Sequence, residues 1–318
     1  MIEFGNRKSS TEKRQSLRAI INGPELGVLP GVFDGYSVNL VEKRGFKAAN
    51  ISGAGLTNSR LARPDIGIMG LEENLDGCRA LCGTVDIPLF ADGDTGYGNA
   101  VNIYYATQAF EDAGVGGVFF EDQTSPKRCG HMKGKTVISV SEMVGKVLAA
   151  VDARRDEHLV IMARTDAAAT HGIDEVIRRA NAYLDAGADI VFPDALRTAE
   201  DIERVVAETN GPVCINMGFG LRSRATTPLM SPAAMEACGV SIAFYARLLT
   251  SSAVRGMTNA LDAFAEQTQT GTVVERPDLC VSFEDLEGLV GLNEAIAFAD
   301  RYADEGPKVR SVVNRMQP

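Results

Sequence analysis

The chain has 318 residues, of which 45% are hydrophobic and 23% are charged, and its formal net charge at pH 7 is −10. This composition is typical of a globular protein with a large core, and the acidic balance argues against a surface that binds nucleic acid or anionic membranes. We expect neither secretion nor membrane spanning, because the amino terminus opens no apolar signal segment and no stretch approaches 18 consecutive apolar residues.

Short apolar runs alternate with longer amphipathic stretches along the chain. Eight runs predict buried β-strands, because they are nearly continuous in hydrophobic residues, as parallel strands covered on both faces are. They lie at residues 27–29, 48–51, 88–91, 117–120, 159–163, 189–192, 212–215 and 240–244. Apolar residues at helical spacing follow several of them, for example over 102–113 and 174–186, and glycines end several of these helices.

Eight strands alternating with helices predict a (β/α)8 TIM barrel, an α/β fold, with a doubly wound open sheet as the alternative. We expect residues 1–26 to form a helical lead-in, residues 27–266 the catalytic barrel and residues 267–318 a C-terminal helical extension. A helical segment is predicted from Phe283 to Tyr302. Its apolar residues need a partner surface, either on their own barrel or on that of a neighbouring subunit.

The six cysteines are spread over the whole chain. This distribution is typical of reduced thiols in a cytoplasmic protein rather than of a disulfide framework. Cys78 and Cys82 are four residues apart in a predicted helix and lack a second pair of ligands, which argues against a zinc site.

Polar residues follow the predicted strands at their carboxyl ends, where active sites of such barrels lie. Ser52, Gly53 and Ala54 offer backbone N–H groups to an anion. The later strands end in Asp92 and Asp94, in Glu121, in Arg164, in Asp194 and in Asn216.

Three of these residues predict a metal site. Asp92, Asp94 and Glu121 offer hard oxygen ligands without His or Cys, which favours Mg²⁺ or Mn²⁺ over zinc. Arg164 is predicted to clamp a carboxylate, because its fork binds carboxylates through two parallel hydrogen bonds.

The stretch Lys127-Arg128-Cys129-Gly130-His131 places two cations, a thiol and an imidazole within five residues. A thiol flanked by cations in a glycine-bearing loop has a lowered pKa and can exchange a proton near neutral pH. The alternative is a basic surface loop with an incidental cysteine.

The strand-end residues and the stretch 127–131, in their order along the chain, resemble motifs of the isocitrate lyase and phosphoenolpyruvate mutase superfamily. Within it, the chain is most similar to the branch of 2-methylisocitrate lyases, 2,3-dimethylmalate lyases, oxaloacetate hydrolases and carboxyphosphonoenolpyruvate mutases. The resemblance implies a (β/α)8 barrel that uses Mg²⁺ and closes the loop bearing Cys129 over a small anionic carboxylate substrate. It also implies a homotetramer, a dimer of helix-swapped dimers in which paired subunits exchange a C-terminal helix.

The resemblance further assigns roles to individual residues. Lys127, Arg128, His131 and Arg164 would support negative charge, and Cys129 would protonate the leaving carbanion. The substrate would be bound by Ser52, Gly53, Ala54, Asp65, Gly130, Arg164, Asp194 and Asn216. The implied reaction is cleavage of a 2-hydroxy di- or tricarboxylate, similar to 2-methylisocitrate or dimethylmalate, into a 2-oxo acid and a second carboxylic acid. The alternatives are an oxaloacetate hydrolase or decarboxylase and a carboxyphosphonoenolpyruvate phosphonomutase.

Two departures from the family pattern leave the substrate open. Asp194 stands where many lyase relatives carry Glu. The segment from Asn216 to Pro228 is longer than usual, lacks a Glu and adds Arg222 and Arg224. These arginines indicate either a more anionic distal group on the substrate or a longer surface loop.

Overall fold

A computed structural model describes residues 7–128, 134–220, 227–303, 306–313 and 315–316. The chain divides into two compact units, of which one is Ser9–Ser252 and the other takes in Ala253–Pro318. This division differs from the boundary predicted at residue 266. The helix that follows the last strand, α11 (Leu248–Thr270), contributes residues to both units.

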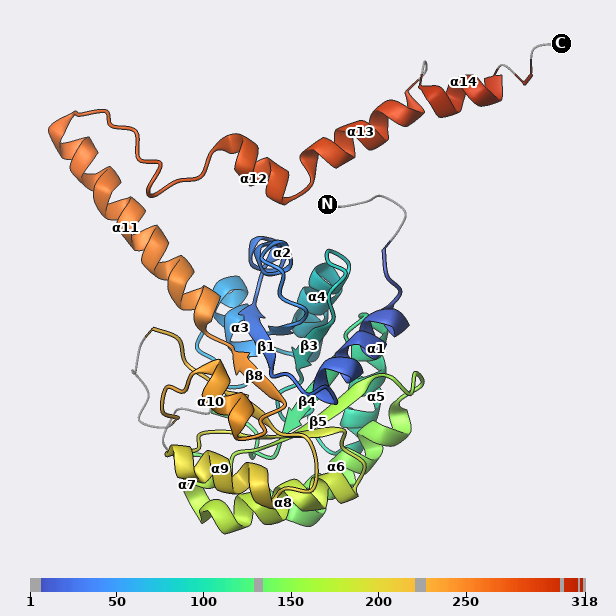
Figure 1. Cartoon of the computed structure of the whole chain (residues 1–318), viewed down its shortest axis with the longest axis vertical. Helices are drawn as coiled ribbons and strands as arrows, with labels where there is room; N and C mark the ends of the chain where they lie inside the picture. The colour runs from blue at the N-terminus through green and yellow to red at the C-terminus, as the bar shows by residue number, and fades with distance from the viewer. Residues whose placement is uncertain (1–6, 129–133, 221–226, 304–305, 314, 317–318) are drawn as a thin grey trace. The chain divides into compact units, whose positions relative to one another are not determined.

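The first unit is built on eight parallel strands in the described part of the chain (Figure 1). They are β1 (Gly27–Val32), β2 (Ala49–Ile51), β3 (Leu89–Asp92), β4 (Gly117–Glu121), β5 (Val160–Thr165), β6 (Ile190–Pro193), β7 (Cys214–Asn216) and β8 (Ile242–Tyr245). Neighbours pair in the order β6-β5-β4-β3-β2-β1-β8-β7, and a bridge between Val191 and Val213 joins the two ends. The predicted strands and the (β/α)8 barrel are therefore confirmed.

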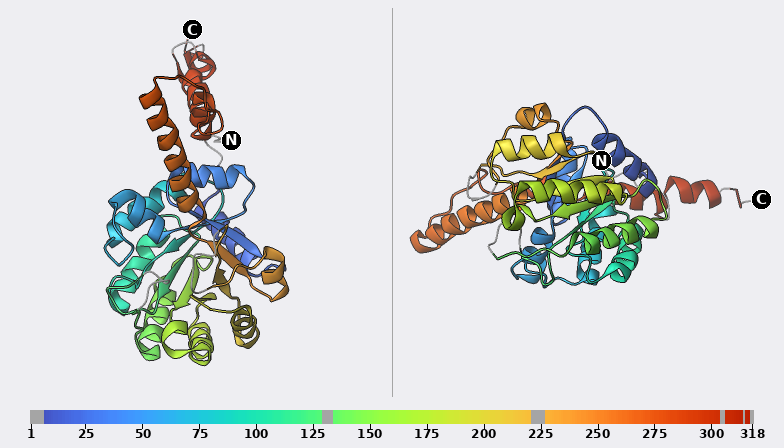
Figure 2. Two further views of the ribbon diagram at one scale, coloured as in Figure 1. Left: turned by 90° about the vertical axis from the view of Figure 1, so that its left-hand side faces the viewer. Right: turned by 90° about the horizontal axis from the view of Figure 1, so that it is seen from below.

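Helices cover the outside of this barrel (Figures 1 and 2). The outer helices are α2 (Gly35–Lys43), α4 (Leu71–Cys82), α5 (Ala100–Asp112), α6 (Val140–Ala153), α8 (Ile173–Asp185), α9 (Ala199–Glu208) and α10 (Pro232–Ala237). Two short helices, α3 (Gly53–Leu61) and α7 (Ala168–His171), directly follow β2 and β5. Helices α5 and α8 agree with the predicted ranges within two residues.

Helix α1 (Ser10–Ile21) closes the amino ends of the strands. Its Leu17 and Ile21 are buried in one apolar cluster with strand residues such as Leu29 and Phe90. The Nζ of Lys13 on this helix donates to the Val85 carbonyl oxygen at 2.6 Å, just before β3. The predicted lead-in is thus a plug, a helix that closes the amino end of the barrel. Its polar side chains donate hydrogen bonds to carbonyl groups at that end.

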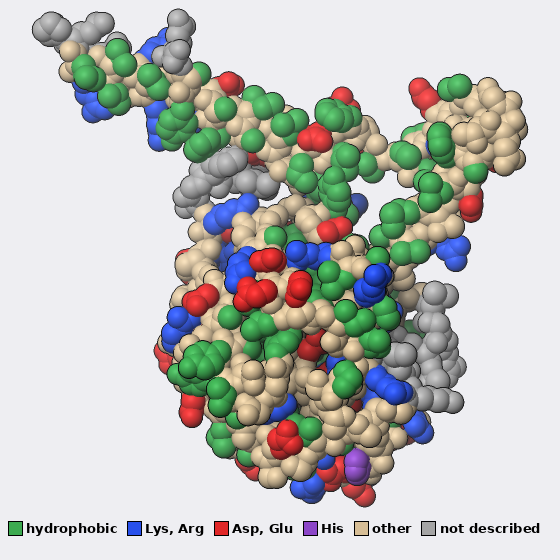
Figure 3. Space-filling view, turned by 180° about the vertical axis from the view of Figure 1, so that it is seen from behind, with side chains coloured by type: hydrophobic (Ala, Val, Ile, Leu, Met, Phe, Trp, Pro, Cys, Tyr) green, Lys and Arg blue, Asp and Glu red, His purple; other side chains and the backbone are tan. Residues whose placement is uncertain are grey.

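The second unit is helical and presents many apolar side chains (Figure 3). It contains most of α11 and the helices α12 (Phe283–Leu289), α13 (Leu292–Tyr302) and α14 (Pro307–Val313), and no described residue of these four helices is buried. The single segment predicted from Phe283 to Tyr302 is two helices, because Gly291 adopts a left-handed conformation with φ of 83° between them. Within the described residues, no helix is long and apolar enough to span a bilayer.

Candidate active site

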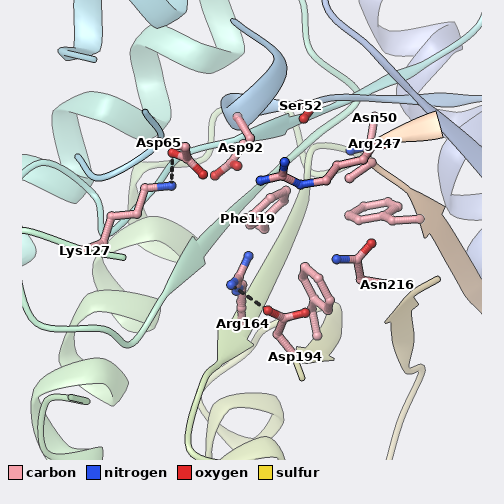
Figure 4. Close-up of a pocket in the computed structure, with 14 residues that line it drawn as sticks. Asn50, Ser52, Asp65, Asp92, Phe119, Lys127, Arg164, Asp194, Asn216 and Arg247 are labelled. Carbon is pink, nitrogen blue, oxygen red and sulfur yellow. Dashed lines mark hydrogen bonds and ion pairs between the residues drawn. The ribbon is translucent and has the colours of Figure 1, made fainter. Parts of the chain in front are cut away.

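A pocket opens at the carboxyl ends of the strands, and most of the predicted site residues meet there (Figure 4). Its wall combines charged side chains with the rings of Phe119, Phe192 and Phe244. Predicted residues that line it are Ser52, Ala54, Asp65, Asp92, Lys127, Arg164, Asp194 and Asn216. Segments that are far apart in the sequence are thus brought to one end of the barrel, as the fold requires.

Arg164 lies near the end of β5, opposite Glu121 of β4 in the sheet register. Its Nε donates to Asp166 Oδ2 at 2.8 Å, and its Nη2 donates to Asp194 Oδ2 at 2.8 Å. The guanidinium also lies over the ring of Phe192, 5.1 Å from the ring centroid. Burial alone would lower the pKa of Arg164, but the carboxylates of Asp166 and Asp194 raise it well above its ordinary value. Arg164 is therefore a permanently charged group held in one orientation at the pocket wall.

Lys127 lines another part of the same pocket. Its Nζ is 2.6 Å from Asp65 Oδ1 and 2.7 Å from Asp94 Oδ1, and all three side chains are at least nine-tenths buried. Burial alone would lower the pKa of Lys127, but Asp94 and Glu121 raise it well above its ordinary value. This ion pair explains why Asp65, which lies in the loop after α3, reaches the pocket.

Asp92, Asp94 and Glu121 are buried carboxylates whose charges disfavour one another. Burial and then the charge of Asp94 raise the pKa of Asp92 to about 7. Burial raises the pKa of Asp94 and of Glu121 as well. Glu121 Oε1 is buried and receives a hydrogen bond from none of the described residues. A bound cation would relieve this arrangement, because it favours the ionised form of nearby carboxylates.

The three carboxylates do not converge as a complete shell of direct ligands. Across the ranges that the structure describes, no group of three or more His, Cys, Asp or Glu residues could hold an ion. Asp92 lines the pocket, whereas Asp94 contacts Lys127 and Glu121 Oε2 lies 3.3 Å from Arg164 Nε. Mg²⁺ commonly uses one or two carboxylates and completes its coordination with water and substrate oxygens. A carboxylate that lines the pocket fits such a Mg²⁺ site, and ligation by Asp92, Asp94 and Glu121 stays a prediction.

The start of helix α3 forms the part of the wall predicted to bind an anion through its backbone. Ser52 is the N-cap of α3, and its Oγ accepts a hydrogen bond from the Gly55 N–H at 3.0 Å. At Gly53 a Cβ atom would lie 2.5 Å from Asp92 Oδ2. Glycine is therefore required there for the helix terminus to approach the proposed metal ligand.

The loop expected to carry the proton donor is only partly described. Cys129, Gly130 and His131 lie outside the described residues, and so do Arg222 and Arg224 of the extended segment. Before the gap, the side chain of Gln123 holds the Arg128 backbone through hydrogen bonds at 2.8 and 3.0 Å. The exposed side chain of Arg128 lines a separate surface hollow beside Gly134 and not the pocket that Lys127 lines, and its support of negative charge stays a prediction.

A second network of buried polar side chains holds the end of β5, where Arg164 lies. Asp166, which holds Arg164, also accepts a hydrogen bond from Lys135 Nζ at 2.6 Å. The neighbouring Asp122 carboxylate accepts hydrogen bonds from Thr165 Oγ1 at 2.7 Å and from Tyr183 Oη at 2.8 Å. The end of β5 is therefore fixed by polar contacts that keep the orientation of Arg164.

Several pocket residues were not predicted from the sequence. Asn50 of β2 and Arg247, directly after β8, both line the pocket. Asn50 is a polar residue within an apolar strand, and this was a usable signal because buried amides require partners. Arg247 follows the last strand just as Arg164 and Asp194 lie at the ends of earlier ones, so strand-end position could have identified it.

Comparisons with known proteins agree with this geometry. A family model described as phosphoenolpyruvate phosphomutase matches residues 17–265. The 2,3-dimethylmalate lyase of Eubacterium barkeri is 36% identical over 287 residues, which cover 90% of this chain and 97% of that protein. A probable 2-methylisocitrate lyase 2 of Corynebacterium glutamicum is 38% identical over 296 residues, covering 93% and 94% of the two chains.

Solved structures are similar over nearly the whole chain. An oxaloacetate acetylhydrolase in complex with the inhibitor 3,3-difluorooxalacetate has a TM-score of 0.85 at 30% identity, covering 94% of this chain and 99% of that one. A 2,3-dimethylmalate lyase has a TM-score of 0.82 at 30% identity, covering 95% and 97%. The similarity therefore takes in residues of both units.

Proposed function

This chain belongs to the phosphoenolpyruvate mutase and isocitrate lyase superfamily, and on that basis we propose that it is a Mg²⁺-dependent carbon–carbon lyase. Its substrate would be a 2-hydroxy di- or tricarboxylate similar to 2-methylisocitrate or dimethylmalate, and its products a 2-oxo acid and a second carboxylic acid. The observation that carries the proposal is the pocket in which Arg164, fixed by Asp166 and Asp194, faces Asp92 and Lys127.

The residues of the pocket would bind and orient the α-oxygenated end of the substrate. Arg164 would hold its carboxylate, and the backbone at Ser52 and Ala54 would bind further oxygen atoms. Asp92 would hold the Mg²⁺ ion, with Asp94 and Glu121 close to it. When bound, Mg²⁺ supplies a Lewis acid that stabilises negative charge on the substrate's oxygen atoms.

Bond cleavage would follow transfer of the proton of the 2-hydroxyl group to a base, for which the pocket offers carboxylates. The oxygen's electron pair forms the carbonyl of the 2-oxo acid while the neighbouring C–C bond breaks, and the electron pair of that bond moves to the leaving carbon. Cys129 would donate the proton that converts this carbanion into the second acid. Lys127 and His131 would stabilise its negative charge, and Arg128 would join them if the loop moves it toward the pocket.

Cleavage or decarboxylation of a 2-oxo diacid is the second candidate function. It is favoured by the likeness to the oxaloacetate acetylhydrolase, which extends over 94% of this chain. In the same pocket, the hydrolysis would use a water molecule and the decarboxylation a proton, and neither reaction would pass through the cleavage of a 2-hydroxy acid.

The assembly and location follow from the same assignment. Apolar side chains such as Val254, Met257, Leu261 and Phe264 are exposed along α11. They would be covered in a homo-oligomer, a dimer of helix-swapped dimers. The free thiols of Cys78, Cys82 and Cys214 support a cytoplasmic location, where cysteines stay reduced.

A panel of 2-hydroxy and 2-oxo di- and tricarboxylates, incubated with the protein and Mg²⁺, tests the proposed function. Release of pyruvate or glyoxylate from a hydroxy acid would support the lyase. Oxalate formed from oxaloacetate would establish the hydrolase instead, and an inert protein across the whole panel would overturn both. Each active compound is repeated with EDTA, which should stop the reaction.

A further inference from the structure

Arg247 reaches the pocket because the chain turns closely over the barrel after β8. It lies between the end of β8 and the start of α11. A Cβ atom at Gly31 of the neighbouring strand β1 would lie 2.3 Å from the Ala246 carbonyl oxygen. Glycine at position 31 is therefore what allows Ala246 to lie against β1. The next residue, Arg247, lies in the pocket wall, where Figure 4 shows its guanidinium extending into the cavity.

The charges of the pocket are balanced because of this residue. Its described lining contains three carboxylates, Asp65, Asp92 and Asp194, and three cations, Lys127, Arg164 and Arg247. Without Arg247 the formal charge of these side chains, not counting a bound Mg²⁺ ion, would be −1, so Arg247 makes the lining more favourable to an anionic ligand. Arg247 is exposed at the mouth, so an incoming solute can reach it.

The three cations come from three different parts of the wall. Lys127 follows β4 and contacts Asp65 and Asp94, and Arg164 belongs to β5 and contacts two other carboxylates. Arg247 follows β8 and extends its guanidinium into the pocket from that side (Figure 4). Cations that enter from three strand ends suit a ligand with three carboxylates.

Asn50 lies on the same side of the pocket as Arg247 (Figure 4). It pairs in register with Gly31, the glycine against which Ala246 lies. Its Oδ1 atom is buried and receives no hydrogen bond from the part of the chain that the structure describes. The unpartnered Oδ1 can accept a hydrogen bond from a ligand hydroxyl group, and the Nδ2 group of Asn50 is the one that would donate to a ligand carboxylate beside the guanidinium.

We infer that Arg247, assisted by Asn50, is a specificity-determining residue that binds a third carboxylate of the substrate, which makes the substrate a tricarboxylate. This inference rests on the proposed function, in which Arg164 takes the α-carboxylate and Lys127 stabilises the negative charge of the leaving fragment. Arg247 then selects among acids that share this reacting core and differ in a remote anionic group.

Binding of two unreactive acids tests the inference without any turnover. Propane-1,2,3-tricarboxylate and propane-1,2-dicarboxylate differ by one carboxylate, and neither has the 2-hydroxyl group that cleavage requires. Their dissociation constants are measured by calorimetry with Mg²⁺ for the wild type and for the variants Arg247→Gln and Arg247→Lys. Arg197→Gln is the matched control. Arg197 is an exposed arginine in the loop after β6, so this substitution removes the same charge from the same end of the barrel.

The wild type should bind the tricarboxylate about tenfold more tightly than the dicarboxylate, because one charge-assisted hydrogen-bonded contact has that effect. Arg247→Gln should remove this preference while its affinity for the dicarboxylate stays within about twofold of that of the wild type. Arg247→Lys should retain part of the preference, and Arg197→Gln all of it.

Three results would overturn the inference: a wild type without preference, an Arg247→Gln variant that keeps it, or an equal loss of affinity for both acids. A circular dichroism spectrum like that of the wild type shows that each variant is folded. The proposed lyase activity is judged separately by 2-oxo acid release, so a tricarboxylate preference in a protein that cleaves no hydroxy acid would reject the activity alone.

Discussion

At the amino ends of the strands, helix α1 covers the barrel with Leu17 and Ile21, which pack on strand residues in one apolar cluster. At the carboxyl ends, the wall is built from buried charged groups such as Asp92, Arg164 and Lys127, of which the two cations form ion pairs with neighbouring carboxylates. The amino end is closed by apolar contacts, which depend only on the shape and hydrophobicity of the side chains. The carboxyl end is open, and its function depends on the direction of each side chain. Substitutions at the carboxyl end should therefore change turnover, and those at the amino end should change stability.

The largest effect should come from Asp92→Ala at the open end. Removing the carboxylate proposed to bind the metal should reduce Mg²⁺-dependent turnover by about 10³-fold or more, because Lewis-acid stabilisation of the oxyanion is lost. Mn²⁺ binding, followed by electron paramagnetic resonance, should weaken in parallel. Asp76→Ala, which removes an exposed carboxylate on α4, is the control. Unchanged Mn²⁺ affinity in Asp92→Ala would reject Asp92 as a ligand.

Cys129→Ser should lower turnover by about 10²- to 10⁴-fold, because a hydroxyl group is a much poorer proton donor to carbon than a thiol beside cations. The affinity for propane-1,2-dicarboxylate should remain close to that of the wild type, since the walls around Arg164 and Lys127 are untouched. Rates measured by 2-oxo acid release and affinities measured by calorimetry separate the two effects. Full activity in the variant would exclude Cys129 as the proton donor.

The closed end should show the opposite pattern in Leu17→Ala. Leu17 is fully buried, and truncating such a leucine costs about 2–5 kcal/mol of the free energy of unfolding. Turnover at 25 °C should stay close to that of the wild type, because the plug is at the other end of the barrel. Leu148→Ala on α6, where the leucine is 48% exposed, is the matched control and should cost about 0.5 kcal/mol or less. Urea denaturation gives both values, and a large loss of turnover in Leu17→Ala would show that the ends are coupled.

The features that could be predicted from the sequence are those that depend on local patterns. The strands, the barrel, the superfamily and the enzyme class are confirmed, because buried strands and ordered motifs are local patterns in the chain. The contact of Lys127 with Asp65 and the entry of Arg247 over Gly31 were not predicted. Both depend on how loops turn after the strands end, and side-chain periodicity carries no information about that path.

Helix α1 illustrates the same limit at the closed end. Its capping box, with Ser9 as the N-cap and Glu12 at the third helical position, predicts where the helix starts. Its place under the barrel depends on contacts with distant segments, such as that of Arg14 Nε with the Val115 carbonyl oxygen at 3.1 Å. A helical lead-in could therefore be predicted, whereas its function as a plug could not.

The smallest effect should be a pH-dependent one, at the contact that ties α1 to the loop before β5. Asp156 Oδ2 accepts hydrogen bonds from Arg14 Nη1 and Thr11 Oγ1, both at 2.8 Å. Burial acts to raise the pKa of Asp156, but the hydrogen bonds from Arg14 and the His158 N–H outweigh it and lower the pKa to about 2 from the ordinary 3.8. The folded state therefore gains stability from ionised Asp156 above about pH 4 and loses it as the pH falls toward 2.

Asp156→Asn should accordingly lower the free energy of unfolding by roughly 1 kcal/mol at pH 6, allowing for solvent screening of this partly exposed group. The difference from the wild type should shrink between about pH 4 and pH 2, because protonation then removes the same charge from the native residue. Urea denaturation at pH 6, 4 and 3 measures it, with the exposed Asp152→Asn as the control for a general loss of negative charge. A difference that stays constant over this range would mean that Asp156 holds α1 by its shape and neutral hydrogen bonds rather than by its charge.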